Sequence, residues 1–103
     1  MRLRREGTHV RSGLLSCTMV IDSSCSGPYV GYALGRSFGS AVRRNRLRRQ
    51  LRVLVKEREA MLPPGILVFG GSSRACELSF ASLGLQFDRL VATIARRAES
   101  ARP

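Results

Sequence analysis

The sequence is poor in aromatic residues, in acidic residues and in lysine. Aromatic side chains make up 6% of its 103 residues and Trp is absent, so the hydrophobic core has to be mainly aliphatic. Seven Asp and Glu stand against 18 Lys and Arg, a net charge of +11 at pH 7, and Lys56 is the only Lys. Such a surplus repels itself unless a polyanion neutralises it, and arginine binds phosphate through two parallel hydrogen bonds. The charge therefore favours a nucleic-acid partner, with an anionic membrane surface or a merely basic solvent-exposed surface as alternatives.

Cysteine and histidine are also scarce. Cys17, Cys25 and Cys76 form no C-x-x-C pair, and the only His, His9, lies far from a paired Cys, so no zinc site is expected. An odd number of widely spaced cysteines suits a reducing compartment, which predicts a cytoplasmic protein with Cys17 in the core. No apolar run approaches the ~20 residues that span a membrane.

Hydrophobic patterning predicts a sheet of short strands. Strands are expected at 13–22, 29–34 and 66–69, and the turn-forming residues 23–28 are expected to join the first two in an antiparallel hairpin. Along the first strand, side chains alternate between an apolar face, with Leu15, Cys17, Met19 and Ile21, and a more polar face, with Leu14, Ser16, Thr18 and Val20.

Two helices complete the expected order β-β-α-β-α. The first runs from an N-cap at Ser40 to about Leu62, where two prolines stop it, and the second follows Ser79 after a loop over 70–78. Residues 1–12 are expected as a basic arm or a helix stub, and 96–103 as a frayed tail. The prediction is one α+β domain over 1–103, a two-layer α/β sandwich with a small, mostly antiparallel sheet.

The first helix concentrates the positive charge. Its leucines fall within about a third of the circumference, whereas arginines fill most of the rest. Like charges three or four residues apart cost a few tenths of a kcal/mol per pair, and only Glu57 and Glu59 lie near enough to relieve them. A solvent-exposed face normally mixes charges of both signs, so this one predicts a polyanion-binding surface. The core needs the apolar side, which argues against a membrane-surface helix.

The glycine-rich turn before the helix suits a phosphate. Gly35 and Gly39 allow close backbone approach, Arg36 adds a charge, and the helix start offers free N–H groups. Asn45, within the arginine cluster, either contacts a nucleotide or a metal-bound water, or is only a polar residue near the cap. The same turn matches the G-x-S-x-G pattern of hydrolases around Ser37. However, the chain is too short for that fold, and its only His precedes the Ser.

The run from Val30 to Arg52, with Arg44-Asn45-Arg46 on a long helix after a strand and a Gly-rich turn, resembles the bacterial ribonuclease P protein subunit. Leu62 to Phe69 fits the next strand of that family, and the resemblance covers roughly residues 6 to 95. It implies a partner, a catalytic RNA that removes the 5′ leader from precursor tRNA with Mg²⁺ held mainly by the RNA. It implies neither a catalytic residue on the protein nor a small-molecule substrate.

The motif match also implies roles for single residues. Arg44, Arg46 and Arg49 are expected to face the catalytic RNA. Asn45, Arg48 and Arg52 are expected to face a leader cleft that has the sheet as its floor, with Ser16 and Thr18 on it. The full set of expected RNA-binding residues is Arg36, Arg43, Arg44, Asn45, Arg46, Arg48, Arg49, Arg52 and Lys56.

The sequence departs from the family pattern in places. The family begins with a helix whose aromatic residues line the cleft, whereas this chain has no aromatic before Tyr29 and at most a helix stub in residues 1–6. Ser16 and Thr18 stand where a bulkier cleft residue is usual, and Ser37 replaces a second cation in the turn. Since base stacking contributes ~1–3 kcal/mol per base, weak leader discrimination is expected. The alternative function is a ribosomal-type protein that binds structured RNA without a role in tRNA processing.

Overall fold

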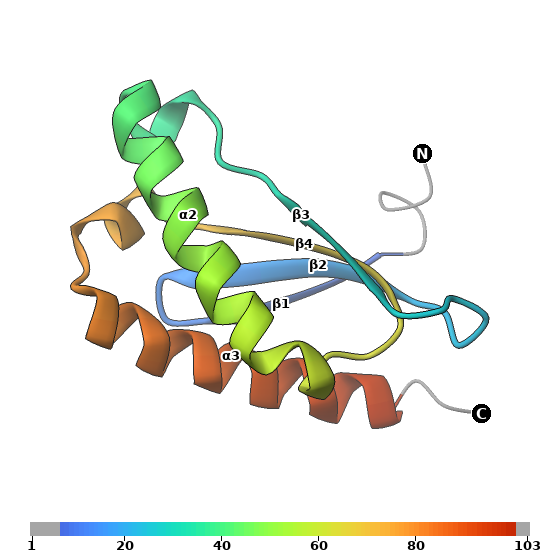
Figure 1. Cartoon of the computed structure of the whole chain (residues 1–103). Helices are drawn as coiled ribbons and strands as arrows, with labels where there is room; N and C mark the ends of the chain where they lie inside the picture. The colour runs from blue at the N-terminus through green and yellow to red at the C-terminus, as the bar shows by residue number, and fades with distance from the viewer. Residues whose placement is uncertain (1–6, 101–103) are drawn as a thin grey trace.

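The computed structural model describes residues 7–100 (Figure 1). A four-stranded sheet has the order β1-β2-β4-β3. Figure 1 shows both long helices on one side of this sheet. The strands are β1 (Thr8–Ser12), β2 (Leu15–Ile21), β3 (Pro28–Tyr32) and β4 (Gly65–Gly71), the helices are α2 (Ala41–Arg58) and α3 (Phe80–Ser100), and the short 3-10 turns are η1 (Arg36–Phe38), η2 (Glu59–Met61) and η3 (Ser73–Glu77).

The predicted hairpin between the strands at 13–22 and 29–34 is wrong. β4 lies between β2 and β3, antiparallel to β2 and parallel to β3. The most apolar strand takes the centre, where Leu67 and Phe69 are 0% and 1% exposed. The turn after β2 is held to the start of β4 instead, because Asp22 N donates to Pro64 O at 3.1 Å. Two of the three strand pairings are antiparallel, so the mostly antiparallel sheet is confirmed.

A fourth strand replaces part of the predicted basic arm. β1 pairs antiparallel with β2, and Gly13 turns the chain between them with a φ of 60°. Val10 is buried, whereas His9 and Arg11 on either side point to the other face. This short alternation is a strand signal that the surrounding charge obscured. Residues 1–6, where a helix stub was expected, lie outside the described residues.

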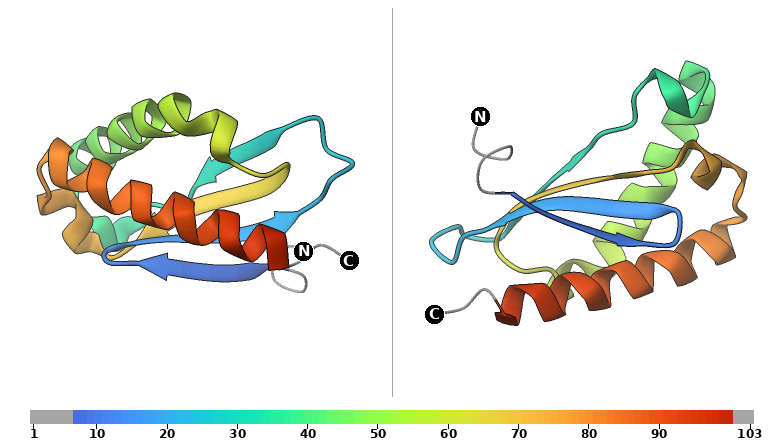
Figure 2. Two further views of the ribbon diagram at one scale, coloured as in Figure 1. Left: turned by 90° about the horizontal axis from the view of Figure 1, so that it is seen from below. Right: turned by 180° about the vertical axis from the view of Figure 1, so that it is seen from behind.

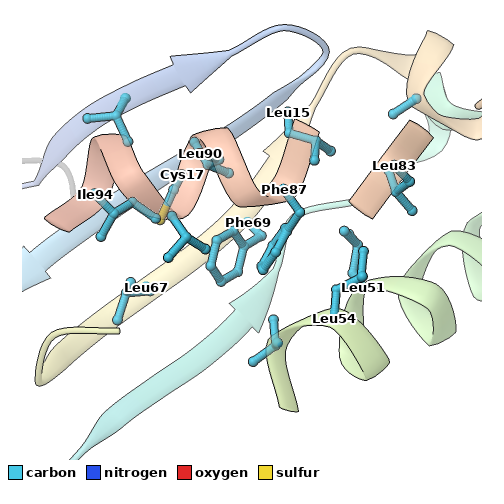
Figure 3. Packing of buried hydrophobic residues seen from close by; sticks show 14 of the residues in the cluster. Leu15, Cys17, Leu51, Leu54, Leu67, Phe69, Leu83, Phe87, Leu90 and Ile94 are labelled. Carbon is cyan, nitrogen blue, oxygen red and sulfur yellow. The ribbon is translucent and has the colours of Figure 1, made fainter. Parts of the chain in front are cut away.

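The core lies between the sheet and the two helices (Figure 3). The rings of Phe69 and Phe87 pack at a tilted angle with centroids 5.1 Å apart, and buried leucines of α2 belong to the same core. Cys17 is 0% exposed, as predicted, and burial raises the pKa of its thiol to about 12. The two-layer α+β sandwich is confirmed.

The C-terminal helix is longer than expected. α3 continues to Ser100, so residues 96–100, expected to fray, are helical. Ala98 is buried one turn beyond Ile94 and extends the apolar stripe of the helix, which explains the extra turn. Residues 101–103 lie outside the described part of the chain.

The two faces of the sheet differ in cover. Side chains of Cys17 and Met19 point toward the helices, so Ser16 and Thr18 point to the opposite face. Seen from behind, that face carries no helix formed by residues 7–100 (Figure 2). We call it the open face of the sheet.

Candidate nucleic-acid interface

Helix α2 is anchored at both ends. At its start, the Ser40 hydroxyl accepts a hydrogen bond from Arg43 N at 3.3 Å, which confirms the predicted N-cap. At its end, the Arg58 guanidinium donates to Asp88 of α3, to Glu57, and to Leu54 O at 3.2 Å. The Asp88 hydrogen bond is the main reason why the pKa of Arg58 is raised. One arginine therefore ties the end of α2 to α3.

Within the described part of the chain, the remaining cations of α2 have no carboxylate partner. Among residues 7–100, both ion pairs of the structure belong to Arg58. The helix buries one side through four residues, Leu47, Leu51, Leu54 and Val55. The other side exposes Arg43, Asn45, Arg46, Arg49, Arg52 and Lys56, with Arg44 and Arg48 half-buried. The predicted separation of an apolar and a cationic side is confirmed.

One flank of α2 carries the expected leader-facing residues. Asn45, Arg48, Arg49 and Arg52 line a hollow on this flank. Arg48 Nη1 donates to Asn45 Oδ1 at 2.8 Å, so the amide of Asn45 orients a neighbouring guanidinium. Tyr32 of β3 lies near Arg52: burial raises the pKa of its hydroxyl, and the positive charge of Arg52 lowers it by a smaller amount.

The opposite flank of α2 carries a second hollow. It is lined by Arg43, Arg46, Leu47, Gln50 and, from η3, Cys76. The thiol of Cys76 donates to Phe38 O of η1 at 3.6 Å. Neither Gln50 nor Cys76 was among the predicted site residues. Gln50 follows Arg46 by four residues, so helical spacing was a signal that could have placed the two side by side. No such signal exists for Cys76, because only the fold brings η3 to this flank.

The expected trio Arg44, Arg46 and Arg49 does not form one surface. Arg46 lines the hollow next to η3, whereas Arg49 lines the hollow next to Asn45. Arg44 and Arg46 are two residues apart, which is about 200° of helix rotation, so they point to nearly opposite sides. Arg44 is half-buried, and its Nε is buried without a hydrogen-bond partner among residues 7–100. The trio contacts one RNA only if that RNA reaches both flanks.

The expected leader cleft is also divided. Ser16 is 6% exposed and Thr18 is hydrogen-bonded to His9, with 3.0 Å between Oγ1 and Nδ1, and both lie on the open face. Asn45, Arg48 and Arg52 lie on α2, which packs on the other face. The hollow that these three line includes no residue of β2. The alternation of β2 was predicted correctly, and the structure places its two polar residues on the opposite side of the sheet from α2.

The open face has an aromatic residue of its own. Tyr29 pairs in register with Ile66 and is 56% exposed, and its hydroxyl is hydrogen-bonded to the Ser26 hydroxyl at 3.0 Å. Sequence reasoning named Tyr29 as the start of a strand and as the first aromatic residue of the chain, but not as a site residue. The parallel pairing with β4 fixes its side, and that pairing was not predicted.

Two of the expected RNA-binding residues, Arg36 and Lys56, line neither hollow. Arg36 is exposed in η1, before the N-cap, and Lys56 is exposed near the end of α2.

Ser37, next to Arg36, is exposed too, but the His9 ring is hydrogen-bonded to Thr18 rather than to this serine. This arrangement gives no support to the hydrolase alternative. In residues 7–100, no helix is long and apolar enough to cross a membrane.

Together these features define a small α+β protein with one helix whose two flanks expose cations that form no ion pair with any described residue. Comparison with known families then identifies it further. The model of the family described as Ribonuclease P matches residues 2–95. The chain belongs to the ribonuclease P family, as the resemblance in its sequence indicated.

Curated relatives agree with this assignment. A ribonuclease P protein component from Acidothermus cellulolyticus is 39% identical over 80 residues, which is 77% of this chain and 67% of the relative. One from Thermobifida fusca is 36% identical over 70 residues, 67% of this chain and 48% of the relative. The alignments thus span between about half and two thirds of these relatives.

Solved structures share the fold at low sequence identity. A Staphylococcus aureus RNase P protein has a TM-score of 0.81 at 14% identity, over 89% of this chain and 84% of that one. The RNase P protein from Thermotoga maritima has a TM-score of 0.78 at 20% identity, over 91% and 86% of the two chains. The arrangement of a mixed sheet with both helices on one face is therefore a feature of this fold.

Proposed function

We propose that this chain is the RNA-binding protein subunit of ribonuclease P and that it assists a catalytic RNA in removing the 5′ leader from precursor tRNA. The observation that carries the proposal is the outer surface of α2, whose arginines have no ion-pair partner among residues 7–100. Unpaired like charges on one helix are costly, and a phosphate backbone relieves that cost. Family membership supports ribonuclease P RNA as the polyanion, with the protein acting in the cytoplasm.

In this proposal, α2 and the open face bind different RNA segments. The arginines of α2 grip the folded catalytic RNA. The open face, with Thr18 and the exposed Tyr29, takes the single-stranded leader, because an exposed aromatic side chain offers a stacking platform for a base. Asn45, Arg48 and Arg52 then lie at the border with bound RNA rather than on the floor of a leader cleft.

Magnesium, in this proposal, is held by the RNA. Mg²⁺ prefers oxygen ligands, chiefly carboxylates and phosphates. Within residues 7–100, no group of three or more His, Cys, Asp or Glu side chains is placed to hold a metal ion, and α2 presents guanidinium groups instead. The donor groups of the described residues therefore do not fit a magnesium site. Its contribution is to reduce repulsion between RNA segments, which lowers the magnesium concentration that the RNA needs.

Reconstitution tests the proposal. The chain is mixed with the ribonuclease P RNA of the same organism, and cleavage of precursor tRNA is measured at low magnesium. A higher cleavage rate than with RNA alone is expected, and no gain would contradict the proposal. Tight binding to ribosomal RNA without any effect on cleavage would favour the ribosomal-type alternative.

A charge-reversal variant locates the effect on α2. Arg46→Glu combined with Arg49→Glu should abolish assembly with the RNA. The matched control is Arg89→Glu with Arg97→Glu, which changes the net charge equally through two exposed arginines of α3. If both double variants lose binding to the same extent, overall charge rather than the α2 surface is responsible.

A further inference from the structure

A third hollow lies at the end of the molecule where α2 passes into β4. It is lined by residues 61–64 of that connection and, from the last two turns of α3, by Ala95, Ala98 and Glu99. Figure 1 shows the connection beside the end of α3. The empty space is about 580 Å³, part of which is open to solvent. We call it the η2 hollow, after the turn that ends at Met61.

The interior of the η2 hollow is apolar. Leu62 and Ala98 are 7% and 8% exposed, whereas Met61 is 57% exposed. Pro63 and Pro64 are half-buried, and neither carries a backbone N–H group. The Met61 side chain is unbranched and polarizable, so it adapts to an apolar side chain placed against it. The hollow therefore offers apolar surface that the folded chain leaves partly in contact with water.

The connection that walls the hollow is fixed by backbone hydrogen bonds. Leu62 N donates to Glu59 O, and Asp22 N donates to Pro64 O, both at 3.1 Å. The two consecutive prolines also restrict φ on this path, because the ring of proline locks that angle. The hollow is therefore formed before any partner binds, which lowers the entropy lost on binding.

The charge of the η2 hollow is opposite to that of the whole chain. Among residues 7–100, Glu99 is the only charged residue that lines it, and both ion pairs belong to Arg58 instead. Glu59 is exposed in the turn that leads into the hollow and adds a second carboxylate. Arg96 of α3 does not line it, and its guanidinium is hydrogen-bonded to Thr93. On a chain with a net charge of +11, this hollow is a local acidic site.

These charges decide which occupant fits the hollow. The Glu99 carboxylate repels the phosphates of RNA and of an anionic membrane. A second copy of this chain brings the same net charge of +11, which opposes self-association. A segment of another protein that carries Arg or Lys beside an apolar residue fits better. Long cationic side chains pack their aliphatic stems on apolar surface and keep the charged head at the rim.

We propose that the η2 hollow docks a basic and apolar segment of a partner protein. An apolar side chain of that segment packs on Met61 and Leu62, and its Arg or Lys pairs with Glu99. A helix rises about 1.5 Å per residue, so Asn45 lies roughly 20 Å along α2 from Arg58, and the hollow lies beyond Arg58. The cationic part of α2 therefore stays free, and this docking does not depend on RNA binding.

Peptide selection tests the chemistry of the docking. A displayed library of short random peptides is selected on the full chain. Peptides that also bind Ala95→Phe are removed, because the larger side chain fills the hollow and leaves every other surface unchanged. The remaining peptides should be enriched in Arg or Lys next to Leu, Ile, Met or Phe. An empty selection, or one enriched in acidic peptides, would overturn the proposal.

The strongest selected peptide then tests the contact with Glu99. Glu99→Gln should weaken its binding about twofold to fivefold, the range of an exposed ion pair. Replacing the Arg or Lys of the peptide by Gln should cost as much, and the two changes together should cost no more than either alone. The controls are Glu77→Gln on η3 and Ala92→Phe on α3, both exposed and outside the lining, which should leave the affinity unchanged. Equal losses from Glu99→Gln and Glu77→Gln would contradict the ion pair and with it the proposal.

Met61 reports on occupancy of the hollow directly. In a protein with ¹³C-labelled methionine methyl groups, the NMR signal of Met61 should shift when the selected peptide is added. Met19, which is 1% exposed in the core, is the internal control and should not shift. A Met61 signal that stays unchanged at saturating peptide would show that the peptide binds elsewhere.

Other occupants of the hollow give different results. A loss of RNA affinity in Ala95→Phe would assign the hollow to RNA. Self-association of the unmodified chain in sedimentation equilibrium, abolished by Ala95→Phe, would assign it to a second copy. Either result would overturn the docking of a basic segment. Circular dichroism checks that the variants are folded, and Ala95→Phe should bind ribonuclease P RNA as the unmodified chain does. If the unmodified chain does not bind that RNA, the proposed function fails while the peptide results still decide the docking.

Discussion

Arg48 and Asn45 form a hydrogen-bonded pair on the exposed side of α2, with Nη1 2.8 Å from Oδ1. They lie one helical turn apart, so the pair needs no distortion of the backbone. The amide holds the guanidinium in one orientation before any RNA arrives. A preoriented donor loses less side-chain entropy on binding than a free one.

The Asn45–Arg48 pair should matter for binding and not for stability. Asn45→Ala is expected to weaken RNA binding about threefold to tenfold, the range of one hydrogen bond. The unfolding free energy should change by less than about 0.5 kcal/mol because the site is exposed. The control is Thr93→Ala, which removes the corresponding pair with Arg96 on α3. Equal effects on RNA binding from both changes would contradict this role.

The Arg58–Asp88 tie should matter for stability. The Arg58 side chain is 17% exposed and also lies over the Phe87 ring, 5.9 Å from its centroid. Arg58→Ala should lower the unfolding free energy by about 1–3 kcal/mol in urea denaturation, through lost hydrogen bonds and packing. Arg89→Ala, at an exposed position beside Asp88, should change it by less than about 0.5 kcal/mol. An Arg58→Ala protein as stable as the unmodified chain would show that α2 is held by its leucines alone.

Cys17 should make the fold sensitive to alkaline pH. Burial raises the pKa of its thiol from 9.0 to about 12, so the folded state keeps a proton that the unfolded chain releases. The stabilisation is complete below about pH 9 and declines as pH rises toward 12, by at most ~1.4 kcal/mol per pH unit. Measured against pH, the stability of Cys17→Ala should decline less steeply than that of the unmodified chain between pH 9 and 11. Parallel curves would contradict the assignment.

Tyr29 should contribute to leader binding only. Tyr29→Ala is expected to weaken the binding of precursor tRNA by ~1–3 kcal/mol, the contribution of one stacked base, with affinity for mature tRNA unchanged. Val42→Ala, at an apolar position on α2 that is 78% exposed, serves as a control away from the open face. Equal losses for precursor and mature tRNA would place the leader elsewhere.

Much of this architecture could be predicted from local pattern. The leucines of α2 and the Ser40 cap follow from helical periodicity and from hydrogen-bonding chemistry near the chain itself. The position of β4 could not be predicted, because strand order depends on pairings between distant segments such as Tyr32 with Phe69. Cys76 and Arg46 line one hollow for the same reason, because the fold brings two segments distant in the sequence together.

The different directions of the arginines on α2, in contrast, could be predicted from the sequence. A helix turns by about 100° per residue, so the spacing of Arg44 and Arg46 already places them on opposite sides. The motif match implied only that both residues, with Arg49, face the catalytic RNA. The structure shows that a motif of consecutive residues on a helix describes several directions at once.

The salt dependence of RNA binding tests the central claim most directly. The affinity of the chain for ribonuclease P RNA is measured over a range of salt concentrations, for the unmodified protein and for Arg46→Ala with Arg49→Ala. If these arginines contact phosphates, the slope of log affinity against log salt should become shallower by about 0.7–0.9 for each lost contact. A variant with the same slope and affinity as the unmodified chain would contradict RNA binding through α2.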